Sequence, residues 1–327
     1  MGRQDRKMIP GETKQLIPGS SVDFALPRAG DLDLHSLLLR VNATLTNTVA
    51  YSGTAQDYAQ LLATFQVIAD GEVIKQGTGR FLALGQNYRN TLFTYNLAPP
   101  AGVGTYSLQH QYMIDFSSVD CVLPKDSILR TGLYSNLVLR VFASQVGDLY
   151  PVGVGVGSFT SLTASVSYRF SQEYEARTVP WISTCYSITG VDLSAAHGYP
   201  GTEVKLSATG RGTWIKGIFV ETYNSQTRAY SQSISNIAFG QIHDKWWDLN
   251  VSDMVGWNAW DSEVVNRTGT YLADLTRVSE GPARLVDARD MTDIAEPRLW
   301  LANSALANQV ADIHVFGFKM ARQPAAA

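Results

Sequence analysis

Hydrophobic and polar residues alternate along much of the chain, which is the pattern of β-strands that bury one face. The alternation is clearest in LLLRVNATL from Leu37 to Leu45, LVLRVFA from Leu137 to Ala143 and LTASVSYRF from Leu162 to Phe170. Further runs that favour strands are Val22 to Leu26, Phe65 to Ile68, Glu72 to Lys75, Val204 to Leu206, Trp214 to Val220, Ile237 to Ile242, Leu299 to Leu301 and Ile313 to Phe318. The pattern predicts a mainly β protein.

Turn and helix signals are local. Asp70-Gly71 lies between two strand-favouring runs and predicts a tight hairpin, because Asp-Gly tolerates the positive φ angles of two-residue turns. Short helices are expected at Ala55 to Thr64, Asp253 to Ser262 and Asn303 to Ala311. For the second of these, Ser252 is the expected N-cap. Met254, Trp257 and Asp261 are expected toward one side of that helix.

An internal repeat is the most informative feature of the sequence. PGSSVDFALPRAGDLDLHSLLLRV from Pro18 resembles PGTEVKLSATGRGTWIKGIFVET from Pro200. Pro18-Gly19 matches Pro200-Gly201, Val22 matches Val204, Phe24 matches Leu206 and Gly30 matches Gly212, each pair 182 residues apart. Each copy contains a turn, an alternating strand, a glycine corner with an arginine, and a more continuously apolar strand.

Two later segments repeat in the same order. Ile114-Asp115-Phe116 followed by NLVLRVFAS resembles Ala273-Asp274-Leu275 followed by PRLWLANSA, and SLTASVSYRF resembles ADIHVFGFK. The offset shrinks along the chain, as shared strands with different loop lengths would require. The repeat therefore predicts a duplication.

Each half then holds about eight strands, which suits a sandwich or jelly roll. The predicted fold class is all-β, with two tandem eight-stranded jelly rolls and short helical insertions. The expected domains are an N-terminal arm at 1–17, a first jelly roll at 18–172, a connector at 173–199, a second jelly roll at 200–320 and a C-terminal tail at 321–327.

Composition limits the classes of partner. Charged residues make up 17% of the chain, below the usual share of about 25%, which suits broad uncharged contacts with other copies. The net charge of −3 provides no global attraction to nucleic acid. The sequence shows no secretory signal and no apolar run long enough to cross a membrane.

The one basic cluster is formed by Arg3, Arg6 and Lys7 near the N-terminus. A frayed, solvated end is one interpretation. An arm that touches an acidic surface, either lipid headgroups or a genome, is the other. Cys121 and Cys185 are too few for a zinc site or a disulfide framework and are expected as buried free thiols, although one bridge between them stays open.

No motif points to catalysis, and no catalytic, cofactor-binding or metal-binding residue is predicted. The five histidines are His35, His110, His197, His243 and His314, and no two have metal-ligand spacing. Asp31, Asp33 and His35 alternate and could bind a cation, but a solvated strand edge is the favoured interpretation. His243-Asp244 suggests a dyad, yet no G-x-S-x-G motif supplies a nucleophile.

Four tryptophans cluster within a short stretch: Trp246, Trp247, Trp257 and Trp260. One interpretation is a sugar-stacking platform, which would make the chain a carbohydrate-binding or carbohydrate-active jelly-roll protein. The favoured interpretation is a core or interface anchor beside a short helix.

Two segments carry a resemblance to a known family. They are PGSSVDFALPRAGDLDLHSLLLRV, taken as the B–C strand pair, and MIDFSSVDCVLPKDSILRTGLYSNLVLRVFAS. The chain resembles the double jelly-roll major capsid proteins of tailless icosahedral, membrane-containing bacterial viruses, of corticovirus-like or Finnlakevirus-like size. The resemblance covers about residues 10 to 320 and is one of architecture.

The resemblance implies a structural virion protein, not an enzyme, that forms a homotrimer of pseudo-hexagonal outline and tiles an icosahedral capsid. The implied partners are other copies, neighbouring capsomers, a vertex protein and an internal lipid membrane reached through Arg3, Arg6 and Lys7. It implies no cofactor and no sequence-specific nucleic acid. The protein would be located in the virion and assembled in the host cytoplasm.

Overall fold

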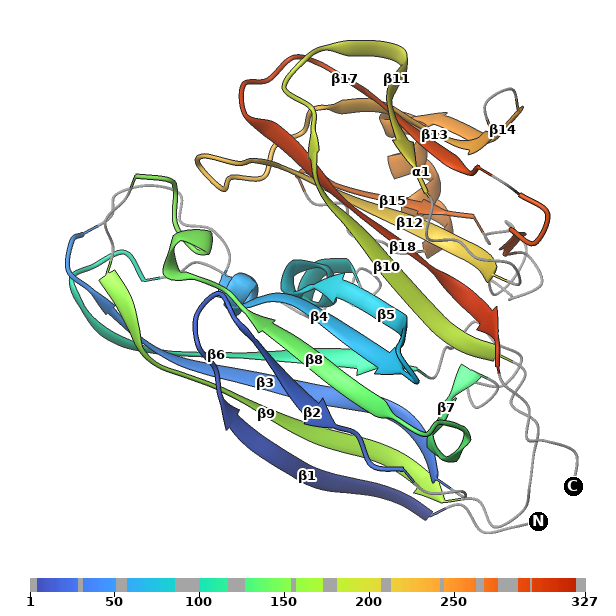
Figure 1. The fold of residues 1–327 in the computed structure, drawn as a ribbon. Helices are drawn as coiled ribbons and strands as arrows, with labels where there is room; N and C mark the ends of the chain where they lie inside the picture. Colours follow the sequence, from blue (N-terminus) through green and yellow to red (C-terminus); the bar gives the residue numbers. More distant parts are fainter. Residues whose placement is uncertain are drawn as a thin grey trace, which may run out of the picture. The chain divides into compact units, whose positions relative to one another are not determined.

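The computed structural model describes residues 5–28, 32–50, 58–85, 100–116, 127–153, 157–172, 181–206, 213–241, 244–262, 268–275, 288–294 and 296–321 (Figure 1). These residues form two compact units. The first unit takes its described residues from 5–84 and 100–185, with Met320 and Ala321. The second takes Gly85 and the described residues from 186 to 319.

One layer of the first unit has the strand order β1-β9-β3-β6. Its strands are β1 (Asp5–Gln15), β9 (Gly157–Gln172), β3 (Leu32–Asn47) and β6 (Gly104–Asp115), and the short β7 (Leu129–Arg130) also pairs with β3. All of these pairings are antiparallel. From Leu37 to Leu45, odd residues of β3 are buried and even ones are more exposed, which is why the sequence alternates there.

The second layer of the first unit has the order β2-β8-β4-β5. Its strands are β2 (Ser21–Ala25), β8 (Leu137–Ala143), β4 (Leu62–Ala69) and β5 (Glu72–Thr78). Asp70 and Gly71 have φ angles of 49° and 86°, so the turn joining β4 and β5 is the predicted tight hairpin. The first residues of β10 (Trp181–Asp192) belong to this unit, where Cys185 pairs in parallel with Lys75 of β5.

The second unit repeats both layers. One has the order β15-β12-β18-β10 and the other β11-β17-β13-β14. Their strands are β11 (His197–Lys205), β12 (Thr213–Asn224), β13 (Ile234–Gln241), β14 (Asp244–Asn250), β15 (Thr270–Asp274), β17 (Arg298–Asn303) and β18 (Gln309–Met320), with β16 (Arg289–Asp290) beside β12. Every strand of the first unit has a counterpart at the same place in these orders.

This strand order is that of a jelly roll in each half, so the predicted all-β double jelly roll is confirmed. The register supports the duplication as well: Val22 pairs with Val141, and Val141 pairs with Phe65. The corresponding row of the second unit runs Val204, Leu299, Phe239. Because β1 takes the place of strand B, the pair taken as B–C from the sequence is the C–D pair, β2 and β3.

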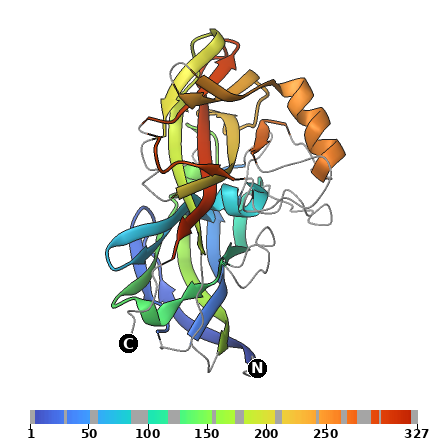
Figure 2. The same ribbon diagram turned by 90° about the vertical axis from the view of Figure 1, so that its right-hand side faces the viewer.

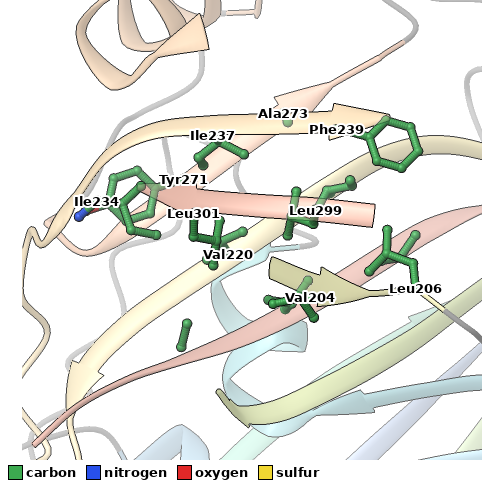
Figure 3. Packing of buried hydrophobic residues seen from close by; sticks show 14 of the residues in the cluster. Val204, Leu206, Val220, Ile234, Ile237, Phe239, Tyr271, Ala273, Leu299 and Leu301 are labelled. Carbon is green, nitrogen blue, oxygen red and sulfur yellow. The ribbon is translucent and has the colours of Figure 1, made fainter. Parts of the chain in front are cut away.

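A hydrophobic core fills the space between the two layers of the second unit (Figure 3). Val204, Leu299, Leu301 and Phe239 come from one layer, and Val220 comes from the other. Figure 3 shows these side chains pointing into a common interior. Burial of each such side chain stabilises the fold by about 1.5–3 kcal/mol before the entropy cost of ordering it.

The helix predictions had mixed outcomes. The helix α1 (Val251–Ser262) is present, and Figure 2 shows it to one side of the strands of the second unit. Its cap is Asn250 and not Ser252, because the Asn250 Oδ1 accepts the backbone N–H of Asp253 at 2.8 Å. Met254 is buried whereas Trp257 is 55% exposed, so they do not share the buried side. Asp261 has no described side chain.

The other two predicted helices are wrong where the structure describes them. In the segment 55–64, residues 55–57 lie outside the described part, η1 (Tyr58–Leu61) is one 3₁₀ turn, and β4 begins at Leu62. The segment 303–311 holds the end of β17, a turn and the start of β18. Tertiary pairing overrode helix propensity at both places. Among the described residues, no helix has the length and hydrophobicity of a membrane span.

Five further strands, β1, β6, β10, β14 and β15, and the two-residue strands β7 and β16 were not predicted from the sequence. The frayed end expected for the N-terminus is wrong for β1, which pairs with β9 from Asp5 to Gln15. Pro10 and Gly11 hid the strand pattern, and Pro is tolerated there because β1 is an edge strand with a register shift after Pro10. β10 lies in the stretch that was expected to be a connector.

Candidate functional site

The predicted Asp31, Asp33, His35 face is not a solvated strand edge in its described part. β3 lies between β9 and β6, and Asp33 is 1% exposed with its Oδ1 3.7 Å from the Arg130 Nε. His35 lies at a β-bulge between Leu34 and Ser36, and its Nε2 is 2.8 Å from the Ser171 Oγ. Asp31 lies outside the described residues. The bulge ends the simple alternation assumed from the sequence.

The tryptophan stretch does not form a single exposed platform. Trp246 and Trp247 lie on β14 and pack against the core of the second unit, whereas Trp257 is exposed on α1. Trp260 has no described side chain. The guanidinium of Arg289 lies 4.2 Å from the ring centre of Trp246, and the Trp246 Nε1 donates to Asp244.

His243 lies outside the described residues, so the predicted dyad of His243 with Asp244 stays untested.

A buried cluster of polar residues surrounds Lys75 in the first unit. The Lys75 Nζ donates to the backbone oxygen of Asp115 and to the Ser183 Oγ, and lies 5.1 Å from the ring centre of Phe116. Desolvation lowers the pKa of Lys75, and burial raises the pKa of the neighbouring Cys185 thiol to about 12. Cys185 is a buried free thiol, as predicted. Cys121 lies outside the described residues.

A second buried cluster of polar residues lies on β10, β12 and β18 of the second unit. The Ser187 Oγ is 2.7 Å from the His314 Nδ1, and the His314 Nε2 is 3.3 Å from the Glu221 Oε1. The side chains of His314 and Glu221 are both 0% exposed. Asp312 accepts from the Gly190 N–H at 2.8 Å. A serine, a histidine and a carboxylate meet here as in a hydrolase triad, but His314 and Glu221 are closed to solvent and only Ser187 is partly exposed.

The first unit presents a broad exposed face on its β1-β9-β3-β6 layer. Rows across the strands are Pro10–Ser167–Leu38–Met113, Thr13–Ser165–Arg40–Gln111 and Gln15–Thr163–Asn42–Gln109, followed by Ser161–Thr44–Ser107. Each of these side chains is exposed or half-buried. We call these residues the polar face; Arg40 is their single charged member.

Sequence reasoning missed both the buried Glu221–His314 pair and the polar face. The signal for the pair was a charged residue inside an otherwise continuous apolar strand, as in IFVETY and DIHVF. The signal for the polar face was alternation of apolar residues with uncharged polar ones instead of charged ones, as in NATLTN and SLTASVS.

Among the described residues, no group of three or more His, Cys, Asp or Glu side chains is placed to hold a metal ion. The basic N-terminal residues are partly placed. Arg6 pairs with Ser171 and Lys7 with Phe170 in the β1–β9 ladder, and Arg3 lies outside the described residues.

The strand orders of the two units define a double jelly roll, and similar solved structures span nearly the whole chain. The major capsid protein P2 from bacteriophage PM2 is 13% identical, with a TM-score of 0.63 over 97% of this chain and 98% of that one. The structure of Sulfolobus Turreted Icosahedral Virus is 12% identical, with a TM-score of 0.65 over 97% of this chain and 90% of that one. The PBCV-1 virus capsid is 13% identical, with a TM-score of 0.66 over 97% of this chain and 94% of that one. No protein-family model and no curated protein sequence matches the chain.

Proposed function

We propose that this chain is the major capsid subunit of an icosahedral virus. The observation that carries the proposal is the double jelly roll, and the PM2 capsid protein matches it over 97% of the chain with a TM-score of 0.63. The polar face supports it, because a broad surface with one charge suits contact with other protein copies. The similar solved structures are capsid proteins, and we propose that the chain has no catalytic activity of its own.

We further propose that three copies form a homotrimer of pseudo-hexagonal outline. Two similar jelly rolls in each chain give six in a trimer, so a threefold object can tile a lattice with sixfold neighbours. Neighbouring capsomers and a vertex protein would be the further partners. The location would be the virion of a bacterial virus, assembled in the host cytoplasm.

Native mass measurement of the purified chain tests the proposal. The expected oligomer has three times the chain mass of 35.8 kDa, and electron microscopy should show hexagonal outlines. The proposal would be contradicted if the chain stays monomeric at high concentration and forms no particles when a kosmotropic salt is added.

For the domain boundaries, we propose that the first jelly roll begins in the expected arm at 1–17, with β1, and that the second begins in the expected connector at 173–199, with β10. The support is that β10 neighbours β18 as β1 neighbours β9. Separate expression of 5–172 and 181–320 would test these limits by the cooperativity of unfolding.

For the membrane, we propose that Arg3, Arg6 and Lys7 contact anionic headgroups, each worth about 1 kcal/mol near such a surface. Flotation with vesicles containing phosphatidylserine should recover the wild type and lose the triple glutamine variant. Neutral phosphatidylcholine vesicles are the control. Equal recovery of both proteins on anionic vesicles would contradict the role.

Carbohydrate binding is the second candidate, and the exposure of Trp257 is the observation that favours it. A glycan array with the wild type and Trp257→Ala tests it. Specific binding that the substitution abolishes would support this candidate. Binding that persists in Trp257→Ala would exclude this residue as the platform.

A further inference from the structure

An exposed aromatic ring lies on the outer side of the β11-β17-β13-β14 layer of the second unit. Tyr199 belongs to β11 and is 65% exposed. The register of β11 against β17 shifts between His197 and Thr202, so the residues between them bulge from the regular ladder. The hydroxyl of Tyr199 reaches β14, where it donates to the Asp248 Oδ2 at 2.6 Å.

A lysine and an asparagine hold this arrangement in place. The Lys245 Nζ donates to the Tyr199 hydroxyl at 2.5 Å, lies 3.8 Å from the centre of the tyrosine ring and is 3.4 Å from the Asp248 Oδ2. The Asn236 Nδ2 donates to the other carboxylate oxygen, Oδ1, at 3.1 Å. Trp300 of β17 is 5% exposed, and its ring centre is 5.7 Å from the same ammonium. The exposed ring is therefore already ordered, which lowers the entropy cost of binding a ligand on it.

The charged groups beside the ring keep hydrogen-bonding capacity. An ammonium has three donors, and in the described part of the chain Lys245 uses two of them, on Tyr199 and Asp248. A carboxylate accepts about four hydrogen bonds, and Asp248 accepts three from described residues. The side chains of Lys245 and Asp248 are 24% and 27% exposed. One donor and one acceptor are therefore open to a ligand beside an exposed aromatic ring.

At the matching place, the described residues of the first unit form no such cluster. The sequence repeat aligns Tyr199-Pro200-Gly201 with Ile17-Pro18-Gly19. The outer row Glu203–Trp300–Ala238–Asp248 of the second unit corresponds to Ser21–Phe142–Thr64–Thr78 in the first. An aliphatic residue and a threonine thus replace the exposed ring and the carboxylate. Because one copy folds without the cluster, the jelly roll itself does not require it.

We propose that Tyr199, Lys245 and Asp248 form a binding site for a neutral saccharide. The apolar face of a pyranose ring packs on an aromatic ring, while its hydroxyl groups both donate and accept hydrogen bonds. A sugar stacked on Tyr199 would bond through neighbouring hydroxyls to Lys245 and Asp248. The opposite charges of these two side chains cancel, so the site does not select an anionic or a cationic ligand. The inference goes beyond the proposed capsid function, because it gives the subunit a means to hold a polysaccharide.

Trp257 is the competing place for a ligand of this class. It is 55% exposed on α1, yet its neighbour Gly256 has no side chain. Its other neighbour, Asn258, is buried and donates from its Nδ2 to the Leu272 carbonyl at 2.9 Å. Tyr199 has an open donor and an open acceptor beside its ring, which favours it as the stacking residue.

A panel of neutral oligosaccharides of glucose, galactose and mannose tests the site in the full-length chain. Tyr199→Ala removes the stacking ring and should weaken binding of the recognised oligosaccharide by about tenfold or more, as measured by titration calorimetry. Asp248→Asn keeps the shape of the side chain but removes its charge, and should weaken binding about tenfold because hydrogen bonds to charged groups are the stronger ones. Ile17→Ala changes the matching position of the first unit and should bind like the wild type. Circular dichroism checks that every variant is folded.

Tyrosine nitration by tetranitromethane gives a second measurement that needs no variant. Tyr199 is 65% exposed, and the half-buried Tyr106 of the first unit is the reference. A saturating concentration of the recognised oligosaccharide should slow the nitration of Tyr199 severalfold and leave that of Tyr106 unchanged. Mass mapping of the peptides distinguishes the two residues.

The outcomes separate this inference from the proposed function. The inference fails if no neutral oligosaccharide binds, or if the chain binds only sialic acid or uronic acid oligosaccharides added to the panel. It also fails if Trp257→Ala abolishes binding and Tyr199→Ala retains it. If Tyr199→Ala does not fold, Asp248→Asn and the nitration of Tyr199 decide. A trimer that binds no saccharide leaves the capsid proposal standing, and a monomer that binds one through Tyr199 leaves the site standing.

Discussion

The strands β3 and β12 occupy the same place in two copies of one fold, yet they bury their side chains differently. From Leu37 onward β3 alternates between buried and more exposed residues, whereas β12 is buried on both faces from Ile215 to Tyr223. The consequence is a polar face in one unit and a buried Glu221–His314 pair in the other. The comparison shows that a fold fixes which strands are neighbours, while the outward residues decide whether a face stays in water.

The largest difference is expected from removing one member of the buried pair. Glu221→Ala leaves a cavity and takes a polar neighbour from His314 in a site that is 0% exposed, and should lower the free energy of unfolding by about 3 to 4 kcal/mol. Arg40→Ala, on the polar face, is the matched change and should cost about 0.5 kcal/mol or less. Urea unfolding measures both. Similar losses would break the comparison between the two faces.

The next difference concerns two glycines of the repeat. Gly19 and Gly201 both have positive φ, at 75° and 108°. A Cβ at Gly201 would collide with the backbone of Leu301, whereas one at Gly19 would meet the flexible Gln145 Nε2 at 2.8 Å. Gly201→Ala should therefore cost about 3 kcal/mol and Gly19→Ala about 1 kcal/mol. Thermal melting of both variants checks this ranking, which equal melting temperatures would overturn.

A pH effect is expected from the first unit. Burial lowers the pKa of His110 from 6.5 to about 4. Between pH 6.5 and 4, His110 is protonated in the unfolded chain but not in the folded chain. The free energy of unfolding therefore falls as the pH drops through this range, by up to about 3 kcal/mol. His110→Leu should lose this dependence, as judged by urea midpoints at several pH values. An unchanged pH profile would show that other groups cause the acid loss.

The smallest effect is expected at Cys185. Burial keeps its thiol protonated at neutral pH, so a thiol reagent should modify it only as fast as the unit opens. Mass mapping of labelled peptides separates it from Cys121. Rapid labelling of Cys185 in the folded chain would mean that the first unit opens far more readily than its buried contacts suggest.

The sequence predicted the architecture because strand alternation, the Asp70-Gly71 hairpin and the repeat all pointed to the same fold. It missed β1, where Pro10 interrupts the pattern, and the bulge at His35, which shifts the buried positions. It also missed the buried polar pair, because Glu221 and His314 become neighbours only through the pairing of β12 with β18. The sequence carries the alternation of the polar face, but its extent depends on the register of β1, β9, β3 and β6.

β1 also bears on how separate molecules of this chain avoid forming fibres. It is an edge strand, and on its side away from β9 it pairs with no strand among the described residues. Such an edge invites sheet growth from one molecule to the next. Pro10 supplies no N–H, and the register shift after it interrupts the row of backbone groups. Pro10 and the register shift therefore limit sheet growth between separate molecules along this edge.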